Sequence, residues 1–310
     1  MIVSIDHGNK NCKVASGKVY SSGLIESDTS FCLGGDCMYY KGKYYTLTDK
    51  RIPYLRDKTI DNRFYILTLF AIAYEIEFAK AYSADEIIDI QLLIGLPPAH
   101  FAKQYAEFEQ YFKSGDYVDF ELNNKVYTIS IDTVVAAPQA FASIMPVYSQ
   151  IKDFTKAIII DLGGMTVDFI GLKKGIPDIS VCDSLENGII KLYNNIVSRL
   201  SSDFDILCEE SDIDAVIRHE ESVFPQEAIA YILKSAKNFV SDLVDKLRER
   251  GIDLKTSKAI FTGGGSLLLR EFINEEQRIG SLIIVDSISA NAKGYEILYK
   301  TQKMNSNENG

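Results

Sequence analysis

Three features are missing from this chain of 310 residues, and each absence excludes a class of protein. The longest apolar run, residues 64–74, contains Thr68 and is followed by Glu75, so it is well short of the roughly 20 residues that a membrane span needs. Met1 leads directly into a strand-like segment, without the basic region that begins a signal peptide. The N-terminus also lacks an amphipathic helix that could tether it to a bilayer. We therefore expect a cytoplasmic protein without a membrane anchor.

Cysteine is scarce and irregularly spaced. The five cysteines are Cys12, Cys32, Cys37, Cys182 and Cys208. They form no CxxC pair and have no histidine at metal-ligand spacing. An odd number of cysteines in a chain without a secretion signal predicts reduced thiols in a cytoplasm. A redox or metal pair at Cys32 and Cys37 is the less favoured alternative.

A basic stripe is also missing. The net charge is −10, and the short basic runs at Lys173-Lys174 and at residues 246–250 are interrupted. Proteins that bind double-helical DNA directly usually present a continuous basic surface, because DNA is a dense line of negative charge. If this protein serves DNA, we expect an adaptor to make the contact.

The composition is that of a globular protein. Hydrophobic residues make up 46% of the chain and charged residues 25%. A chain of 310 residues can hold two domains of ordinary size, each with a filled core.

The most informative stretch runs from Ala157 to Phe169, with the sequence AIIIDLGGMTVDF. Its apolar run is typical of a strand buried on both faces, and the alternation that follows indicates a second strand. Asp161 is therefore expected where the first strand ends, before a tight turn at Gly163 and Gly164. Because glycine has no Cβ and tolerates positive φ, N–H groups in this turn can approach an anionic ligand closely. Such a turn suits a metal ion bound with its phosphate.

The N-terminus repeats this pattern. Apolar residues lead into Asp6, Gly8 follows, and a strand-like segment runs from Cys12 to Ala15. A third element, residues 259–269 (AIFTGGGSLLL), places three glycines between an apolar strand and a helical pattern. The two copies indicate a duplicated domain with a ligand between the copies. If they face each other, carboxylates about 4 Å apart would repel by roughly 4 kcal/mol, a cost that a divalent cation removes.

Four motifs together resemble those of the actin, heat-shock chaperone and sugar-kinase superfamily of ATPases. DHGNKNCK (residues 6–13) is similar to the first phosphate motif, and DLGGMTVDF to the second. TGGGS (residues 262–266) is similar to the adenosine motif, and ANAKGY (residues 290–295) resembles the last connecting helix. Within the superfamily, the chain looks most like the ParM (StbA) actin-like proteins that segregate bacterial plasmids.

The resemblance implies an α/β actin-like ATPase fold, with two duplicated ribonuclease H-like domains around a nucleotide cleft. Domain I would span residues 1–155 and be completed by a C-terminal helix at residues 288–302. Domain II would span residues 156–287, and residues 303–310 would form a disordered tail.

The pattern along the chain predicts further elements. Helical periodicity predicts long helices over residues 59–82 and 225–250. Strand patterns around Asn123-Asn124 predict a hairpin over residues 117–131. We also expect a helix that begins at Pro138-Gln139, because proline is favoured at the first helical position.

The resemblance also implies the catalytic residues. Asp6 and Asp161 would hold magnesium largely through bound water, and Gln139 would orient the attacking water. An amide can position a water without acting as a base, and phosphoryl transfer depends mainly on positioning and charge stabilisation. ParM proteins more often have an acid in place of Gln139, which leaves the hydrolysis rate open. From the residues alone, each aspartate could instead cap a turn, and Gln139 could be a polar residue in a first helical turn.

The nucleotide-binding residues implied by the resemblance fall into two groups. The phosphate-binding group is Gly8, Asn9, Lys10, Asn11, Lys13, Gly163, Gly164 and Thr166. The group beside the ribose and base is Gly263, Gly264 and Gly265. Position alone favours Lys13 as a surface lysine on a strand, and only the motif makes it a phosphate ligand. His7 lies where the motif varies, and no role is assigned to it.

The function implied is that of an ATP hydrolase that polymerises into dynamic filaments with ATP (or GTP) and Mg²⁺. It would segregate plasmid DNA through a ParR-like DNA-binding adaptor, with no direct contact to nucleic acid or membrane. A small-molecule kinase of the sugar-kinase type, or another ATPase of the superfamily that forms no filament, is the main alternative. A chaperone ATPase and a cell-shape actin are less favoured, since no substrate-binding domain follows residue 300 and no membrane anchor is evident.

Overall fold

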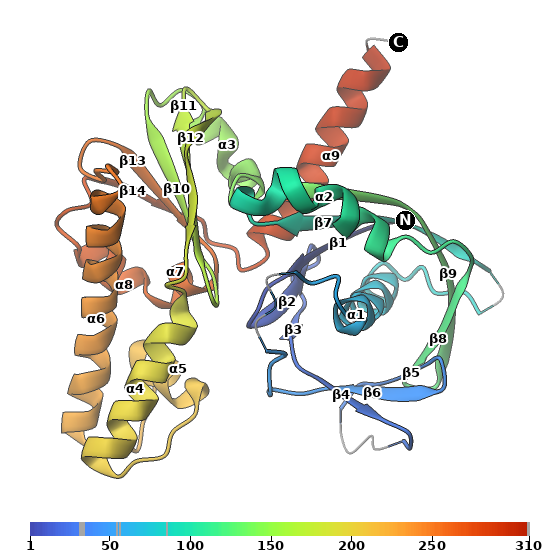
Figure 1. The fold of residues 1–310 in the computed structure, drawn as a ribbon, viewed down its shortest axis with the longest axis horizontal. Helices are drawn as coiled ribbons and strands as arrows, with labels where there is room; N and C mark the ends of the chain where they lie inside the picture. Colours follow the sequence, from blue (N-terminus) through green and yellow to red (C-terminus); the bar gives the residue numbers. More distant parts are fainter. Residues whose placement is uncertain (31–34, 54, 56, 85, 309–310) are drawn as a thin grey trace. The chain divides into compact units, whose positions relative to one another are not determined.

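The computed structural model describes residues 1–30, 35–53, 55, 57–84 and 86–308. The chain divides into two compact units. The first comprises residues 1–146 together with 289–310, and the second comprises residues 147–288. Figure 1 shows a β-sheet and helices in each. No helix in the described ranges is long and apolar enough to cross a membrane.

The first unit is built on a nine-stranded sheet with the order β3-β2-β1-β7-β9-β8-β5-β6-β4. Its strands are β1 (Ile2–His7), β2 (Asn11–Val14), β3 (Val19–Ser21), β4 (Leu24–Ser27), β5 (Cys37–Tyr40), β6 (Lys43–Leu47), β7 (Ile88–Leu96), β8 (Val118–Leu122) and β9 (Lys125–Pro138). The central strands β1, β7 and β9 run parallel, whereas β1 and β2 form an antiparallel hairpin. In the Asp-x-Gly segment Asp6 and His7 end β1 and Gly8 begins the turn of that hairpin, next to the parallel centre of the sheet.

Three α-helices pack in the first unit. They are α1 (Arg63–Phe78), α2 (Pro98–Phe112) and α9 (Ala290–Glu308). Nine apolar side chains of α1 between Phe64 and Ile76 are buried in the core beside β1 and β2. Helix α9 packs on β1 and β7, where Gly95 leaves room for the Tyr295 ring: a Cβ at Gly95 would lie 1.9 Å from its hydroxyl. Glycine in β7 is therefore needed for the C-terminal helix to pack on this sheet.

The second unit is built on a five-stranded sheet with the order β12-β11-β10-β13-β14. Its strands are β10 (Ala157–Leu162), β11 (Val167–Lys173), β12 (Ile176–Leu185), β13 (Lys258–Thr262) and β14 (Ser281–Ile284). β10 pairs in parallel with β13 and in antiparallel fashion with β11. All six residues of β10 are buried, as expected for an apolar strand covered on both faces.

The helices of the second unit pack against one another and on the sheet. They are α3 (Tyr148–Ile151), α4 (Ile189–Phe204), α5 (Glu210–Ile217), α6 (Gln226–Glu249), α7 (Gly264–Leu268) and α8 (Arg270–Glu275). Figure 1 shows α4 and α6 side by side, and both helices bury one apolar face in a common core. The predicted helical face of residues 225–250, from Ile232 to Leu247, is this buried face of α6.

Three sequence predictions are wrong. The segment after Pro138 is a turn, with Ala140 at φ +59°, followed by a 3-10 helix, η1 (Ala142–Val147). Proline ends β9 here instead of beginning a helix, because the preceding residues continue the parallel pairing with β7. The predicted disordered tail is helical as far as Glu308, since α9 extends that far.

The third correction concerns the cysteines. Cys12, Cys182 and Cys208 are free, as predicted, but Cys37 is disulfide-bonded. The expectation that every thiol is reduced therefore fails at this position. Cys32 lies outside the described residues.

Candidate functional site

The first phosphate turn connects β1 to β2. The hairpin closes with the pair His7 and Cys12, and the Gly8 N–H donates to the Asp6 carbonyl at 3.0 Å. A Cβ on Gly8 would lie 2.5 Å from the Asn11 carbonyl oxygen, so only glycine fits at this point. Glycine is therefore required at this position of the motif because two parts of the turn's own backbone approach each other closely here.

Two predicted partners bind the Asp6 carboxylate, which is only 4% exposed. Lys13 Nζ lies 3.3 Å from Oδ2, and the Gln139 amide donates to Oδ1 at 2.8 Å. Gln139 follows the end of β9, and its backbone N–H donates to the Leu96 carbonyl at the end of β7. The structure therefore brings Gln139 to Asp6 and Lys13, two residues of the first motif.

The loop between Gly8 and β2 contains Asn9 and Lys10. It is held by Ser22, whose N–H donates to the Lys10 carbonyl at 3.1 Å and whose hydroxyl donates to the Gly8 carbonyl at 2.5 Å. Asn11 is the first residue of β2 and pairs with Ser21. The predicted phosphate-binding residues 8–11 thus form one short loop whose backbone is fixed by the neighbouring strand.

Sequence reasoning missed Lys58, a residue without a motif. Its ammonium group donates a hydrogen bond to the His7 carbonyl and lies 5.2 Å from the centre of the Phe64 ring. This brings a further cation to the first phosphate turn, besides Lys10 and Lys13. No local pattern could have revealed it, because the contact joins positions 51 residues apart.

His7 points away from the turn into the core. Its ring stacks on Phe112 with centroids 5.1 Å apart, and its Nε2 lies 2.7 Å from the Thr68 hydroxyl. The Thr68 hydroxyl donates its proton to the Phe64 carbonyl, so His7 Nε2–H is the donor to Thr68. Burial, with a smaller effect of Lys58, holds the pKa of His7 well below 6.5. His7 is therefore a neutral anchor of the turn.

The second phosphate turn connects β10 to β11. Asp161 is 7% exposed and stands opposite Asp168 in the hairpin. The Gly163 N–H donates to the Thr166 carbonyl at 2.9 Å. The carbonyls of Gly163 and Gly164 accept the first N–H groups of α4 at 3.1 and 2.9 Å. This turn is thus fixed to the beginning of a helix by backbone bonds.

Thr166, the third predicted residue of this turn, donates from its hydroxyl to the Asp168 carboxylate at 3.3 Å. Gly188, the N-cap residue of α4, lies directly against the turn: a Cβ there would be 2.2 Å from the Gly164 carbonyl oxygen. Glycine at position 188 therefore permits the contact between the turn and α4.

The glycine triplet lies beside Asp161 in the same unit. Thr262 pairs with Asp161 across β10 and β13, and Gly263 follows with φ +89°. A Cβ on Gly263 would lie 2.3 Å from Asp161 Oδ1, and one on Gly265 would lie 2.5 Å from Leu162 Cγ. A Cβ on Gly264 would meet only the tip of Ile288, at 4.0 Å. Two of the three glycines are thus needed for packing, whereas Gly264 faces open space.

The donor set fits a hydrated magnesium ion bound with phosphate oxygens better than a directly ligated metal. In the part of the chain that the structure describes, no group of three or more His, Cys, Asp or Glu side chains could hold a metal ion. Magnesium prefers oxygen ligands and keeps several waters, so one carboxylate in a turn is sufficient on the protein side. The buried Thr262 hydroxyl has no hydrogen-bond partner and stands next to Asp161, which fits a polar ligand at this turn.

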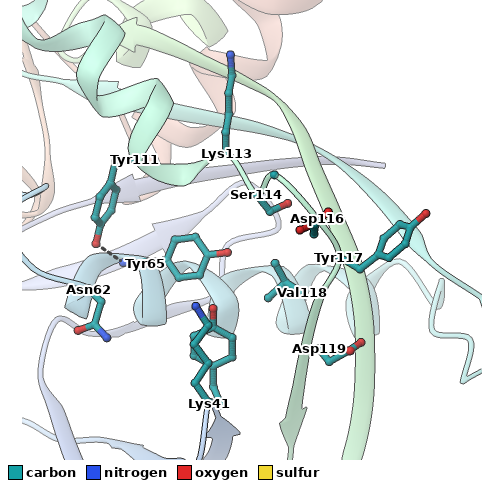
Figure 2. Close-up of a pocket in the computed structure, with 12 residues that line it drawn as sticks. Lys41, Asn62, Tyr65, Tyr111, Lys113, Ser114, Asp116, Tyr117, Val118 and Asp119 are labelled. Carbon is teal, nitrogen blue, oxygen red and sulfur yellow. Dashed lines mark hydrogen bonds between the residues drawn. The ribbon is translucent and has the colours of Figure 1, made fainter.

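A separate pocket of about 740 Å³ lies in the first unit. Figure 2 shows Tyr65 in its centre, with Tyr111 and Asn62 on one side and the β8 residues Val118 and Asp119 on the other. The Tyr111 hydroxyl accepts the Tyr65 N–H at 2.9 Å. None of the predicted site residues lines this pocket, so it is distinct from the phosphate turns.

Two protein-family models match the chain. Residues 4–141 match the N-terminal domain of actin-like proteins, and residues 159–275 match the C-terminal domain of the archaeal, MreB-like actin homologues. A search of curated protein sequences found no match.

Solved structures of actin homologues are similar over nearly the whole chain. Ta0583, an archaeal actin homologue, is 16% identical with a TM-score of 0.76 and coverage of 97% of this chain and 99% of its own. The actin-like protein Alp7A is 16% identical with a TM-score of 0.75 and coverage of 100% and 99%. A subunit of a 15-stranded ParM filament from Clostridium botulinum is 16% identical with a TM-score of 0.74 and coverage of 97% and 99%.

The protein therefore has the actin-like fold, as the sequence motifs predicted. It is an actin-like protein with an actin-like N-terminal domain and an archaeal MreB-like C-terminal domain.

Proposed function

We propose that the protein is an ATPase that assembles into filaments and moves plasmid DNA through a DNA-bound adaptor. The observation that carries the proposal is the set of contacts around Asp6, in which Lys13 and Gln139 bind one buried carboxylate in a turn that only glycine can close. Ta0583, which has the same fold, has been solved with ADP, and the similar ParM of Clostridium botulinum has been solved as a filament. An adaptor is proposed because the chain has a net charge of −10.

In this proposal each of the two turns binds phosphate. Lys13 and Lys58 offset negative charge at the first turn, and the backbone of Gly163 and Gly164 approaches the phosphates at the second. Asp6 would hold magnesium through bound water at the first turn, as would Asp161 at the second, and the ion would neutralise charge on phosphate oxygens. Gly264 leaves the space in which the ribose and base lie.

Gln139 has the geometry to hold the attacking water. Its amide nitrogen donates to Asp6, which fixes the side chain and leaves the amide oxygen as an acceptor for a water O–H. Orienting this water gives in-line attack without a general base, since phosphoryl transfer depends mainly on positioning and charge stabilisation. Gln139 is proposed as a residue that positions the nucleophile.

Right-angle light scattering combined with sedimentation tests the proposal. With Mg²⁺ and ATP, the purified protein should form polymer that pellets and then decays as phosphate is released. GTP in place of ATP identifies the nucleotide, and EDTA serves as the control for magnesium. Turnover of ATP by a protein that stays monomeric at tens of micromolar would reject the filament function. Transfer of phosphate to a panel of sugars would then test the kinase alternative.

A further inference from the structure

The pocket shown in Figure 2 has the size and the lining of a small-molecule site. Its volume of about 740 Å³ lies within the range of about 300–1,000 Å³ that is typical of ligand pockets. Three tyrosine rings line it: Tyr40 at the end of β5, Tyr65 on α1 and Tyr111 on α2. The centre of the Tyr65 ring lies 6.2 Å from that of Tyr40 and 6.3 Å from that of Tyr111. Such a group of rings binds a flat aromatic ligand by stacking and edge contacts.

Hydrogen bonds fix the walls of this pocket. The Tyr111 hydroxyl accepts the Tyr65 N–H at 2.9 Å and donates to the Asp61 carbonyl at 2.6 Å. In the loop before β8, the Ser114 hydroxyl accepts the Ile131 N–H at 2.9 Å, and the Ser114 N–H donates to the Ile131 carbonyl at 3.1 Å. The pocket is therefore already formed, so a ligand would lose little affinity to the ordering of side chains.

One cation extends toward these rings. Lys41, in the turn between β5 and β6, places its ammonium group 5.3 Å from the centre of the Tyr40 ring, and Figure 2 shows its side chain extending toward Tyr65. Lys41 forms no ion pair with any residue that the structure describes. Burial raises the pKa of Tyr65 and of Tyr111, so both phenols are neutral at pH 7. Lys41 can therefore bind an anionic group of a ligand through a charge-assisted hydrogen bond.

The other charged side chains of the lining lie at its rim. Figure 2 shows Lys113 and Asp119 pointing away from Tyr65, and the Asp119 carboxylate accepts the Thr128 hydroxyl at 2.7 Å. Asp116 lies in the exposed loop before β8. A ligand anion would be attracted by Lys41 and repelled by Asp116, so removal of these two charges should change its affinity in opposite directions.

Packed aromatic rings connect the pocket to the first phosphate turn. The Tyr65 ring is stacked with Phe112 at 6.4 Å, and Phe112 in turn is stacked with His7 at 5.1 Å. Phe64, which precedes Tyr65 on α1, contacts the same His7 ring edge-on at 6.2 Å. His7 ends β1, directly before Gly8 in the turn. A shift of Tyr65 on ligand binding can therefore reach the turn through rings that are in contact.

We propose that this pocket binds a planar aromatic molecule that carries an anionic group, and that the bound molecule changes the phosphate affinity of the first turn. The tyrosine rings contact the flat face of the ligand, and Lys41 binds its anion. The rings of α1 and α2 transmit the change to His7. The regulatory part rests on the proposed function, because it assumes that the first turn binds phosphate. The pocket itself does not depend on that function.

Two fluorescent probes test the pocket. Anilinonaphthalene sulfonate is a planar aromatic anion, and N-phenylnaphthylamine is a closely similar molecule without the sulfonate. Fluorescence titration of the wild type should show one sulfonate bound per chain, at least about fivefold more tightly than the uncharged analogue. Equal affinity for the two probes would overturn the anionic assignment.

Substitutions in the lining locate the bound probe. Lys41→Gln should weaken sulfonate binding about tenfold, and Tyr65→Ala at least as much, because each removes a contact with the ligand. Asp116→Asn should instead strengthen binding about twofold, since it removes a repelling charge. Lys103→Gln and Tyr105→Ala, exposed on α2 and outside the pocket, are the matched controls and should bind as the wild type does.

The charge variants keep this test valid if Tyr65→Ala does not fold, because Lys41 and Asp116 are both exposed. Sulfonate binding that neither Lys41→Gln nor Asp116→Asn alters would place the probe elsewhere and overturn the proposal. Weaker binding in both variants would contradict a ligand with only a negative charge.

Titration of ADP with and without saturating sulfonate tests the regulatory part. The probe should change the dissociation constant of ADP at least about fivefold, and ADP should change that of the probe by the same factor. The effect should level off at saturation, whereas direct competition would increase without limit and would overturn the regulatory part. Independent binding of probe and ADP would overturn it as well, with the proposed function intact. A chain that binds no nucleotide would reject the proposed function and its regulation, while the pocket stands on the probe titrations.

Discussion

The two phosphate turns have similar sequences but are held in place differently. The first is held mainly by side chains: Lys13 and Gln139 bind the Asp6 carboxylate, and Ser22 binds the loop. The second is held by its backbone, which bonds to the first N–H groups of α4. At the first turn a substitution therefore removes side-chain contacts that hold the loop, whereas at the second turn replacing a glycine changes the path of the backbone.

The largest effect should come from removing the carboxylate of the second turn. Asp161→Ala should reduce ATP turnover by about a thousandfold, in the range found when one group that stabilises a transition state is lost. Nucleotide affinity should remain within a few-fold, since backbone groups contribute most of the contacts here. Stopped-flow phosphate release and equilibrium binding measure the two quantities. Asp183→Ala, on the exposed part of β12, is the control, and full turnover by Asp161→Ala would refute the catalytic assignment.

A comparison of two adjacent glycines separates ligand binding from folding at the second turn. Gly264→Leu should weaken nucleotide binding at least about tenfold and leave the melting temperature nearly unchanged, because its Cβ would point into open space. Gly263→Ala should instead destabilise the fold by about 1–3 kcal/mol, because it combines φ +89° with a clash against Asp161 Oδ1. Calorimetric titration and thermal melts measure both variants. Equal affinity of Gly264→Leu and the wild type would mean that the triplet serves only as a turn.

The smallest effect should be a pH dependence of the free energy of unfolding. It arises in the first unit, where ionisable side chains hold the β1–β2 hairpin. Ser16, which follows β2, donates a hydrogen bond to Glu75 on α1. Burial raises the pKa of Glu75 above 4.5, which means that the folded state binds the proton more tightly than the unfolded state. Stability therefore increases as the pH falls through the raised pKa, and the cost of the buried charge is complete above it.

Glu75→Gln should accordingly raise the unfolding free energy at pH 7 by about 1 kcal/mol, and the gain should vanish below pH 4.5. Urea denaturation of the variant and the wild type across this range measures the difference. Glu77→Gln is a control of opposite sign, because Lys125 and Tyr127 lower the pKa of Glu77 by hydrogen bonding. Its loss of stability should be complete above pH 4.5 and should disappear as the pH falls through the lowered pKa of Glu77. A pH-independent gain in Glu75→Gln would mean that the carboxyl is not strained by burial.

Much of the fold could be predicted because its signals are local. The apolar run before Asp161 forms β10 with all residues buried, and the periodic stripe in residues 225–250 forms the buried face of α6. The helix predicted to begin at Pro138 does not form, because the pairing of β9 with β7 continues to that residue. Sheet pairing therefore overrides the local preference of proline for the first helical position. The prediction of a disordered tail was wrong because α9 continues beyond Tyr295 and Tyr299, which are packed in the core.

The sequence by itself determined the two Asp-x-Gly turns and the glycine triplet. The features that identify them, an apolar run at the end of a buried strand, a carboxylate and a residue without Cβ, occur at neighbouring positions in the sequence. Only the tertiary structure decided which side chains reach these turns. The Gln139 amide meets Asp6 across 133 residues, and Lys58 meets the His7 carbonyl across 51. Such contacts depend on the strand order and the helix packing of the whole unit, and no periodic pattern in the sequence predicts them.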